Sequence, residues 1–82
     1  MNAADGQPSW FVLVYDTVTM EIVSLNGFGQ DYVSAVLALT GRMDEHRHRP
    51  AVAVHLYGAG SLAELFERHA ELFVRLRFPG GG

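Results

Sequence analysis

The chain has 82 residues and a formal net charge of −3, and 49% of its residues are hydrophobic. This length suits one small domain, which buries only about 60% of its unfolded surface, and the composition excludes a disordered chain. The chain has no cysteine, which excludes a disulfide framework, a thiolate zinc site and a cysteine nucleophile, and an acidic chain is a poor general binder of nucleic-acid phosphates.

The ends of the sequence and its apolar runs bear on the cellular location of the protein. No run approaches the roughly 18–20 apolar residues that a membrane-spanning helix needs. Residues 1–8 lack the basic and apolar segments of a signal peptide. We therefore expect a cytoplasmic protein with no membrane partner. Residues 1–8 and 79–82 are predicted to be flexible tails around a single domain, residues 9–78.

Two strands joined by a tight turn are predicted first. Ser9–Asp16 is rich in β-branched and aromatic residues, and both of its faces are apolar, as is typical of a central strand that is covered twice. Asp16–Thr19 is predicted to form a turn in which the side chains of Asp16 and Thr17 bond to nearby backbone groups. Met20–Asn26 completes the hairpin as a shorter, more polar strand.

A glycine-rich turn then leads into a helix that is predicted to begin near Gln30 or Asp31. The helix ends either at Gly41 or further along, near His46. An apolar stripe on this helix contains Val33, Val36, Leu37 and Thr40, and is extended sideways by Tyr32, Ala35 and Leu39.

Ala51–Tyr57 is predicted to be the third strand, with Pro50 just before it. Because side chains alternate along a strand, Val52, Val54 and Leu56 share one face, and Ala53, His55 and Tyr57 share the other.

The segment 61–78 is predicted to be an amphipathic helix. Ser61 and Glu64 have the spacing of a capping box. Oppositely charged pairs such as Glu64 and Arg68 lie four residues apart on the solvent-exposed face of this helix. One apolar stripe over four turns contains Leu62, Leu65, Phe66, His69, Leu72, Phe73 and Leu76.

The order β-β-α-β-α predicts an α+β fold with a three-stranded mixed sheet in the order 2-1-3 and two helices packed on one face. Strands 2 and 3 would run antiparallel to strand 1. The other face of the sheet would then stay open and apolar, and would need a cover. We expect a non-enzymatic interaction module that forms a homodimer, or that binds another protein as a subunit or regulator. The predicted interface contains Phe11, Leu13, Tyr15, His55 and Tyr57.

The alternative is a small-ligand or anion-binding protein, or a minor enzyme, that uses two Gly-x-Gly turns between a strand and a helix. In the 2-1-3 order both turns lie at the same end of the sheet, and helix N-termini attract anions. Neither turn completes a nucleotide-binding motif. The residues of this alternative site are Gly27, Gly29, Gly58, Gly60 and Ser61.

Three histidines crowd the segment Met43–His55. We interpret this segment as a solvated connection, because zinc needs three or four converging donors and the neighbouring arginines repel a cation. His69 lies in the apolar stripe of the last helix, which favours a core or interface histidine over a catalytic base. We therefore predict no metal, no cofactor, no catalytic residue and no nucleic-acid partner.

Overall fold

The computed structural model describes residues 8–78, so the predicted tails lie outside the described residues except for Pro8. Within that range, the strands and helices follow the predicted order β-β-α-β-α, with one additional short helix near the end. The elements are β1 (Ser9–Asp16), β2 (Ile22–Gly27), α1 (Tyr32–Glu45), β3 (Val52–Ala59), α2 (Leu62–Arg68) and α3 (Ala70–Phe73).

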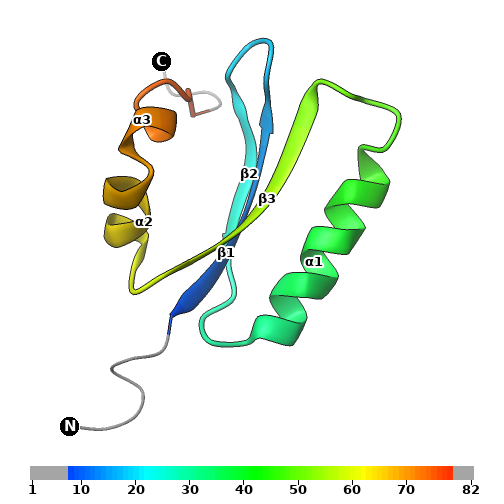
Figure 1. Ribbon diagram of the computed structural model, residues 1–82. Helices are drawn as coiled ribbons and strands as arrows, with labels where there is room; N and C mark the ends of the chain where they lie inside the picture. The colour runs from blue at the N-terminus through cyan, green and yellow to red at the C-terminus, as the bar shows by residue number, and fades with distance from the viewer. Residues whose placement is uncertain (1–7, 79–82) are drawn as a thin grey trace, which may run out of the picture.

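The three strands form one sheet in the order β2-β1-β3 (Figure 1), which confirms the predicted order and the α+β class. Both neighbouring pairs are antiparallel, and Leu13 at the centre of β1 lies opposite Leu25 of β2 and His55 of β3. The prediction of a mixed sheet is wrong. β2 and β3 do run in the same direction, but they never pair with each other because β1 separates them.

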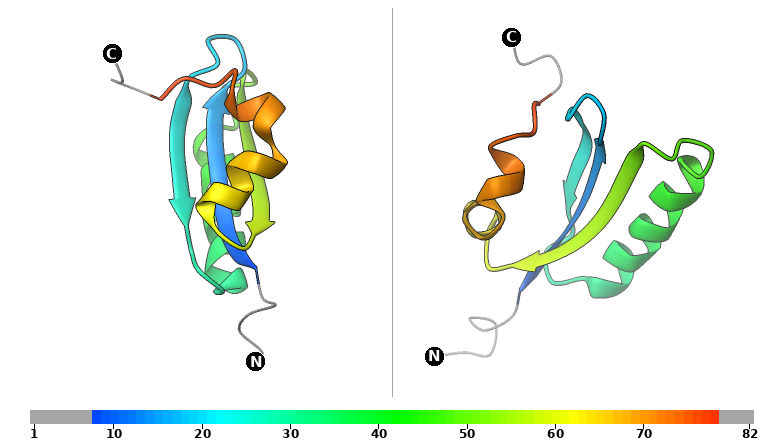
Figure 2. Two further views of the ribbon diagram at one scale, coloured as in Figure 1. Left: turned by 90° about the vertical axis from the view of Figure 1, so that its left-hand side faces the viewer. Right: turned by 45° about the horizontal axis from the view of Figure 1, so that its top comes forward.

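The helices cover opposite faces of this sheet, with α1 on one side and α2 and α3 on the other (Figure 2). On the first side, the ring of Trp10 meets the ring of Tyr32 of α1, with 4.8 Å between centroids. On the second side, Leu65 of α2 packs with Phe11 and Ala59. The prediction of two helices on one face is wrong, because β1 is apolar on both faces and each face takes its own cover.

Helix α1 begins after Asp31, whose carboxylate accepts a hydrogen bond from the Ser34 backbone N–H at 3.0 Å. It runs to Glu45, so the longer of the two predicted helices is the correct one. Its one buried residue is Ala35, which is fully buried against the sheet, whereas Val33 and Leu37 are each 68% exposed. The predicted stripe therefore faces largely outward, because a small residue at the contact lets the helix lie close to the sheet.

The predicted last helix is broken at His69, which ends α2 with φ −118° and ψ 37°. The break lets Leu65 pack over Phe11, while Leu76, beyond α3, reaches the separate cluster around Leu13 and Ile22. The predicted capping box is present, since Ser61 Oγ accepts a hydrogen bond from the Glu64 N–H at 3.1 Å.

The hairpin turn and the segment after α3 hold each other in place. Asp16 Oδ1 accepts hydrogen bonds from the backbone N–H groups of Val18 and Thr19 at 2.8 and 3.0 Å, as predicted for this turn. The Arg77 N–H donates to Met20 O at 2.7 Å, and the Arg77 carbonyl accepts from the Ile22 N–H at 2.8 Å. Residues after α3 thus extend the sheet beside the beginning of β2.

Candidate functional site

The predicted interface residues share one face of the sheet, but α2, α3 and the segment after them cover much of it. Leu13 is 0% exposed and Phe11 is also buried, so the face that we expected to be open is closed at its centre. Only the outer part, with Tyr15, His55 and Tyr57, reaches solvent. Whether any of the five residues meets a partner stays a prediction.

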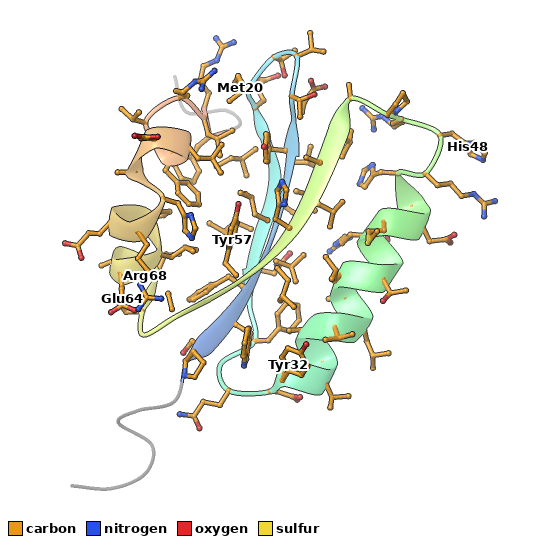
Figure 3. All side chains as sticks on the ribbon, in the orientation of Figure 1. Met20, Tyr32, His48, Tyr57, Glu64 and Arg68 are labelled. Carbon is orange, nitrogen blue, oxygen red and sulfur yellow. The ribbon has the colours of Figure 1, made fainter. Side chains whose placement is uncertain are left out.

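Those three residues form an aromatic row that continues onto His69. The ring centroids of Tyr15 and His55 lie 5.8 Å apart, those of His55 and Tyr57 lie 5.8 Å apart, and those of Tyr57 and His69 lie 4.4 Å apart. Figure 3 shows Tyr57 on the α2 side of the sheet. Burial raises the pKa of the Tyr57 hydroxyl, with a smaller contribution from Tyr15. His69 lies at the break between α2 and α3, where its ring contacts that of Tyr57.

The two Gly-x-Gly turns do lie at the same end of the sheet, since Gly27 pairs with Phe11 and Ala59 pairs with Ser9. The helices that follow them nevertheless leave toward opposite faces, so their N-termini do not line one pocket. Close packing against aromatic rings also explains why two of these positions are glycines. The Trp10 ring lies against Gly58 and the Phe11 ring against Gly27, where a Cβ would come within 2.9 and 3.3 Å.

Both helix starts already hold carboxylates of the chain itself. Glu64 accepts a hydrogen bond from the Gly60 N–H at 2.7 Å. Asp31 accepts from both the N–H and the hydroxyl of Ser34, and these bonds lower the pKa of the Asp31 carboxyl. An anion bound there would have to displace these acids. The geometry gives the alternative ligand site of Gly27, Gly29, Gly58, Gly60 and Ser61 no support.

The histidine-rich segment connects α1 to β3. Arg47 bonds both Asp44 and His48 at 3.2 Å, and these side chains are exposed. The His46 Nδ1 atom is shielded from solvent and has no hydrogen-bond partner among the described residues. Across residues 8–78, no three side chains of the kinds that bind metals come together.

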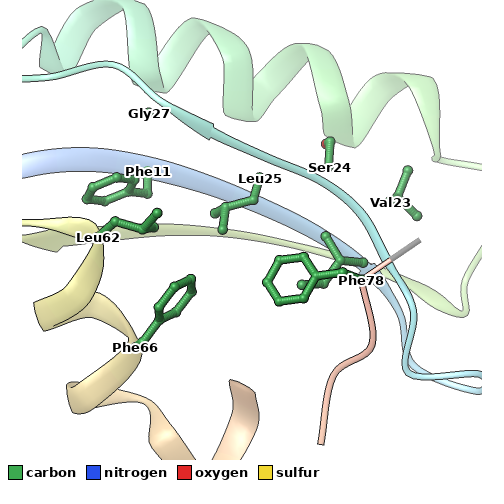
Figure 4. A pocket seen from close by; sticks show the side chains of 9 residues that line it. Phe11, Val23, Ser24, Leu25, Gly27, Leu62, Phe66 and Phe78 are labelled. Carbon is green, nitrogen blue, oxygen red and sulfur yellow. The ribbon is translucent and has the colours of Figure 1, made fainter. Parts of the chain in front are cut away.

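A groove of about 520 Å³ lies between β2 and α2 (Figure 4). Its floor is Phe11 and Leu25 from the sheet, and one wall is Leu62 and Phe66 from α2. Phe78 forms part of the far wall, with its ring centroid 6.5 Å from that of Phe66. The full lining is Phe11, Ile22, Val23, Ser24, Leu25, Gly27, Leu62, Phe66 and Phe78, and none of these side chains ionises.

The groove lies beside an edge of β2 to which, among residues 8–78, no strand pairs at Leu25 and Gly27. The Trp10 C=O accepts a hydrogen bond from the Phe28 N–H, and the Trp10 N–H donates to the Gly29 C=O. The even-numbered residues of β1 therefore direct their backbone groups toward β2. Their partners in β2 direct theirs back toward β1. Leu25 and Gly27 therefore turn their N–H and C=O groups outward, next to the groove.

Sequence reasoning missed this groove. Leu62 and Phe66 were predicted to belong to a stripe buried against the sheet, yet Leu62 is 43% exposed. Phe78 had no assigned role, because the bridge between Arg77 and Glu21 has no recognisable sequence signal. The one available signal was the pair of large apolar residues four apart at the start of α2.

Among residues 8–78, no helix has the length and apolar character to cross a bilayer. Comparisons of the chain with protein-family models, with curated proteins and with solved structures found no match.

Proposed function

We propose that this chain is a small, non-enzymatic protein-interaction module that holds an extended apolar segment of another protein in the groove between β2 and α2. The observation that carries the proposal is the lining of the groove, which is formed almost entirely by apolar side chains and contains no ionisable group. Such a site favours hydrophobic side chains over charged ligands.

The strand edge beside the groove supports an extended partner. Among residues 8–78 no strand pairs with the outward N–H and C=O groups of Leu25 and Gly27, so these groups can pair with another chain in the manner of β-strand addition. Residues 76–78 already pair in this way with the beginning of β2, through the Arg77 bonds to Met20 and Ile22. A bound segment would place alternate side chains between Leu25 and Phe66.

This proposal moves the expected protein contact from the sheet face to the groove, because α2 and α3 cover that face. The expected cytoplasmic location and the expected lack of nucleic-acid, membrane and cofactor partners stay predictions. No observation favours the alternative function at the glycine turns, where Asp31 and Glu64 occupy the helix starts.

The test is selection of peptides from a displayed random library on the wild-type chain, followed by affinity measurements on two matched variants. Leu62→Asp puts a charge into the groove wall, whereas Leu37→Asp puts the same charge on the exposed side of α1. We expect selected peptides with alternating apolar residues, and binding that weakens at least about tenfold in Leu62→Asp but not in Leu37→Asp.

The fluorescence of Trp10, the chain's one tryptophan, reports that both variants are folded, since it lies on the α1 side of the sheet, away from the groove. Amide shifts of Leu25 and Gly27 on peptide addition would support pairing at the edge. Failure to select any peptide, or equal binding by both variants, would contradict the proposal.

A further inference from the structure

The two edges of the sheet differ in how they are protected. Sheet edges expose unpaired backbone groups, and proteins guard them with bulges, charges, prolines or covering segments. β2 has two such guards. Its pairing with β1 contains a register shift beside Val14 and Tyr15, and the Arg77 bridge covers its beginning.

β3 has almost no guard. It pairs with β1 from Val52 to Ala59 in one continuous register, without a bulge. Its sequence, VAVHLYGA, contains no acid, no arginine and no proline. It forms the edge of the sheet opposite β2 (Figure 2), and among residues 8–78 no other strand pairs with its outer side.

The hydrogen-bonding groups on this outer side can be assigned. The odd-numbered residues of β1 direct their N–H and C=O groups toward β3. The Thr17 N–H, just beyond β1, follows the same pattern and donates to Ala51 O. Their partners in β3 point back to β1. The outward groups therefore belong to Val52, Val54, Leu56 and Gly58.

Two of these outward groups are already bonded within the chain. The Val52 N–H donates to Arg49 O at 2.9 Å, and the Gly58 carbonyl accepts from Arg68 Nη1 at 3.4 Å. If two copies of β3 pair antiparallel about His55, these two groups face only each other. The remaining outward groups all find partners, with Val54 opposite Leu56 of the second copy and Val52 opposite Gly58 of the second copy.

We propose that two copies of this chain associate through the outer edges of their β3 strands, antiparallel and about a twofold axis at His55, to form one continuous six-stranded sheet. The inference is independent of the groove, which lies at the opposite edge.

The side chains fit this register. On the α1 side, half-buried Val54 and Leu56 meet their counterparts of the second copy and extend the apolar layer. On the other side, small Ala53 lies opposite the large ring of Tyr57, and exposed His55 lies opposite itself. No charged side chain of β3 opposes another.

The first test uses the absence of cysteine in the natural sequence. In His55→Cys the two thiols belong to a directly opposed, non-hydrogen-bonded pair, with Cα atoms about 4.5 Å apart, a separation that a disulfide can span. In the matched variant Ala53→Cys the thiols lie on the same face but on either side of the opposed His55 pair, four residues apart in register and too far apart to join. We expect mild oxidation to cross-link His55→Cys into a dimer at least about tenfold faster than Ala53→Cys. Equal rates would overturn the proposed register.

The second test measures the solution mass of the intact chain by light scattering from about 5 to 500 μM, a range that reports micromolar dissociation constants. We expect a dimer for the wild type and for Val23→Lys, which changes the β2 edge. We expect monomers for His55→Lys and His55→Asp alone, because like charges would be directly opposed, and a restored dimer when the two are mixed.

Val54→Pro serves as a second disruptive variant, since it removes an outward N–H while leaving the bonds to β1 in place. It should be a folded monomer. A monomeric wild type across the whole range, or a dimer that is lost in Val23→Lys and retained in the His55 variants, would overturn the proposal.

Discussion

The ring of Trp10 in β1 lies against Gly58 in β3, and a Cβ atom added at Gly58 would come within 2.9 Å of the ring. The same ring meets Tyr32 of α1 edge-on, with 4.8 Å between centroids. One aromatic side chain thus joins two strands and a helix, and its position depends on the missing side chain at Gly58.

We therefore expect Gly58→Ala to lower the free energy of unfolding by about 1–3 kcal/mol, because the Trp10 ring must shift to relieve the contact. Gly41 is the matched control, since it lies inside α1 with nothing within 4 Å of an added Cβ. Gly41→Ala should raise the free energy of unfolding by about 0.5–1 kcal/mol, as alanine favours the helix. Urea unfolding measures both, and the prediction fails if the two changes have the same sign.

The orientation of α1 is tested by a second pair of variants. Ala35 is fully buried against the sheet, so Ala35→Leu should overpack the contact and cost about 1–3 kcal/mol. Leu37 is exposed on the opposite side, so Leu37→Ala should change stability by less than about 0.5 kcal/mol. Thermal unfolding followed by circular dichroism separates the two outcomes. A large loss in Leu37→Ala would mean that the helix is turned as the sequence stripe predicted.

The segment after α3 is expected to be a stabilising part of the fold. Leu76 is only 6% exposed and packs with Leu13 and Ile22, so Leu76→Ala should lower the free energy of unfolding by about 2–5 kcal/mol. Val74, which is 82% exposed, provides the control, and Val74→Ala should be nearly neutral. Comparable denaturation midpoints for both variants would show that residues 74–78 do not pack on the sheet.

Acid is expected to weaken the fold through Asp16 and Asp31. Backbone hydrogen bonds from Thr19 and Val18 lower the pKa of the Asp16 carboxyl below 3.8, and the bonds from Ser34 lower that of Asp31. A carboxyl with a lowered pKa in the folded state stabilises the fold above its unfolded pKa, and this stabilisation is lost as the pH falls through the folded pKa.

Stability should therefore fall below about pH 4 in the wild type. In the double variant Asp16→Asn, Asp31→Asn it should fall less steeply over the same range, because neither amide titrates. Denaturant unfolding at several pH values from about 2 to 7 makes the comparison. Identical slopes in the two proteins would refute the assignment.

The fold could be predicted from the sequence where a hydrophobic pattern was compatible with only one arrangement of the strands. β1 is apolar on both faces, which placed it in the centre of the sheet, and its bounds Ser9–Asp16 agree with the structure. The same pattern did not reveal that each face has its own helix, because an edge strand such as β3 can be followed by a helix on either side.

The orientation of α1 and the groove were beyond the sequence for a different reason. Hydrophobicity ranks Val33 and Leu37 above Ala35, but the distance between helix and sheet is set by the size of the contacting residue, and only the assembled sheet defines it. The groove likewise depends on the break at His69 and on the position of Phe78, both of which result from tertiary contacts.

The hydrogen bonds between Arg77 and the beginning of β2 also affect the order in which parts of the domain fold during synthesis. Residues 76–78 leave the ribosome after all three strands, so the hairpin can form while the segment that covers its edge is still being made. During that interval Leu13 and Ile22 lack the Leu76 side chain that later shields them. Until Leu76 and Arg77 are in place, the apolar side chains of Leu13 and Ile22 and the edge at the beginning of β2 lack their cover, and such exposed surface is what makes incompletely folded chains prone to aggregate.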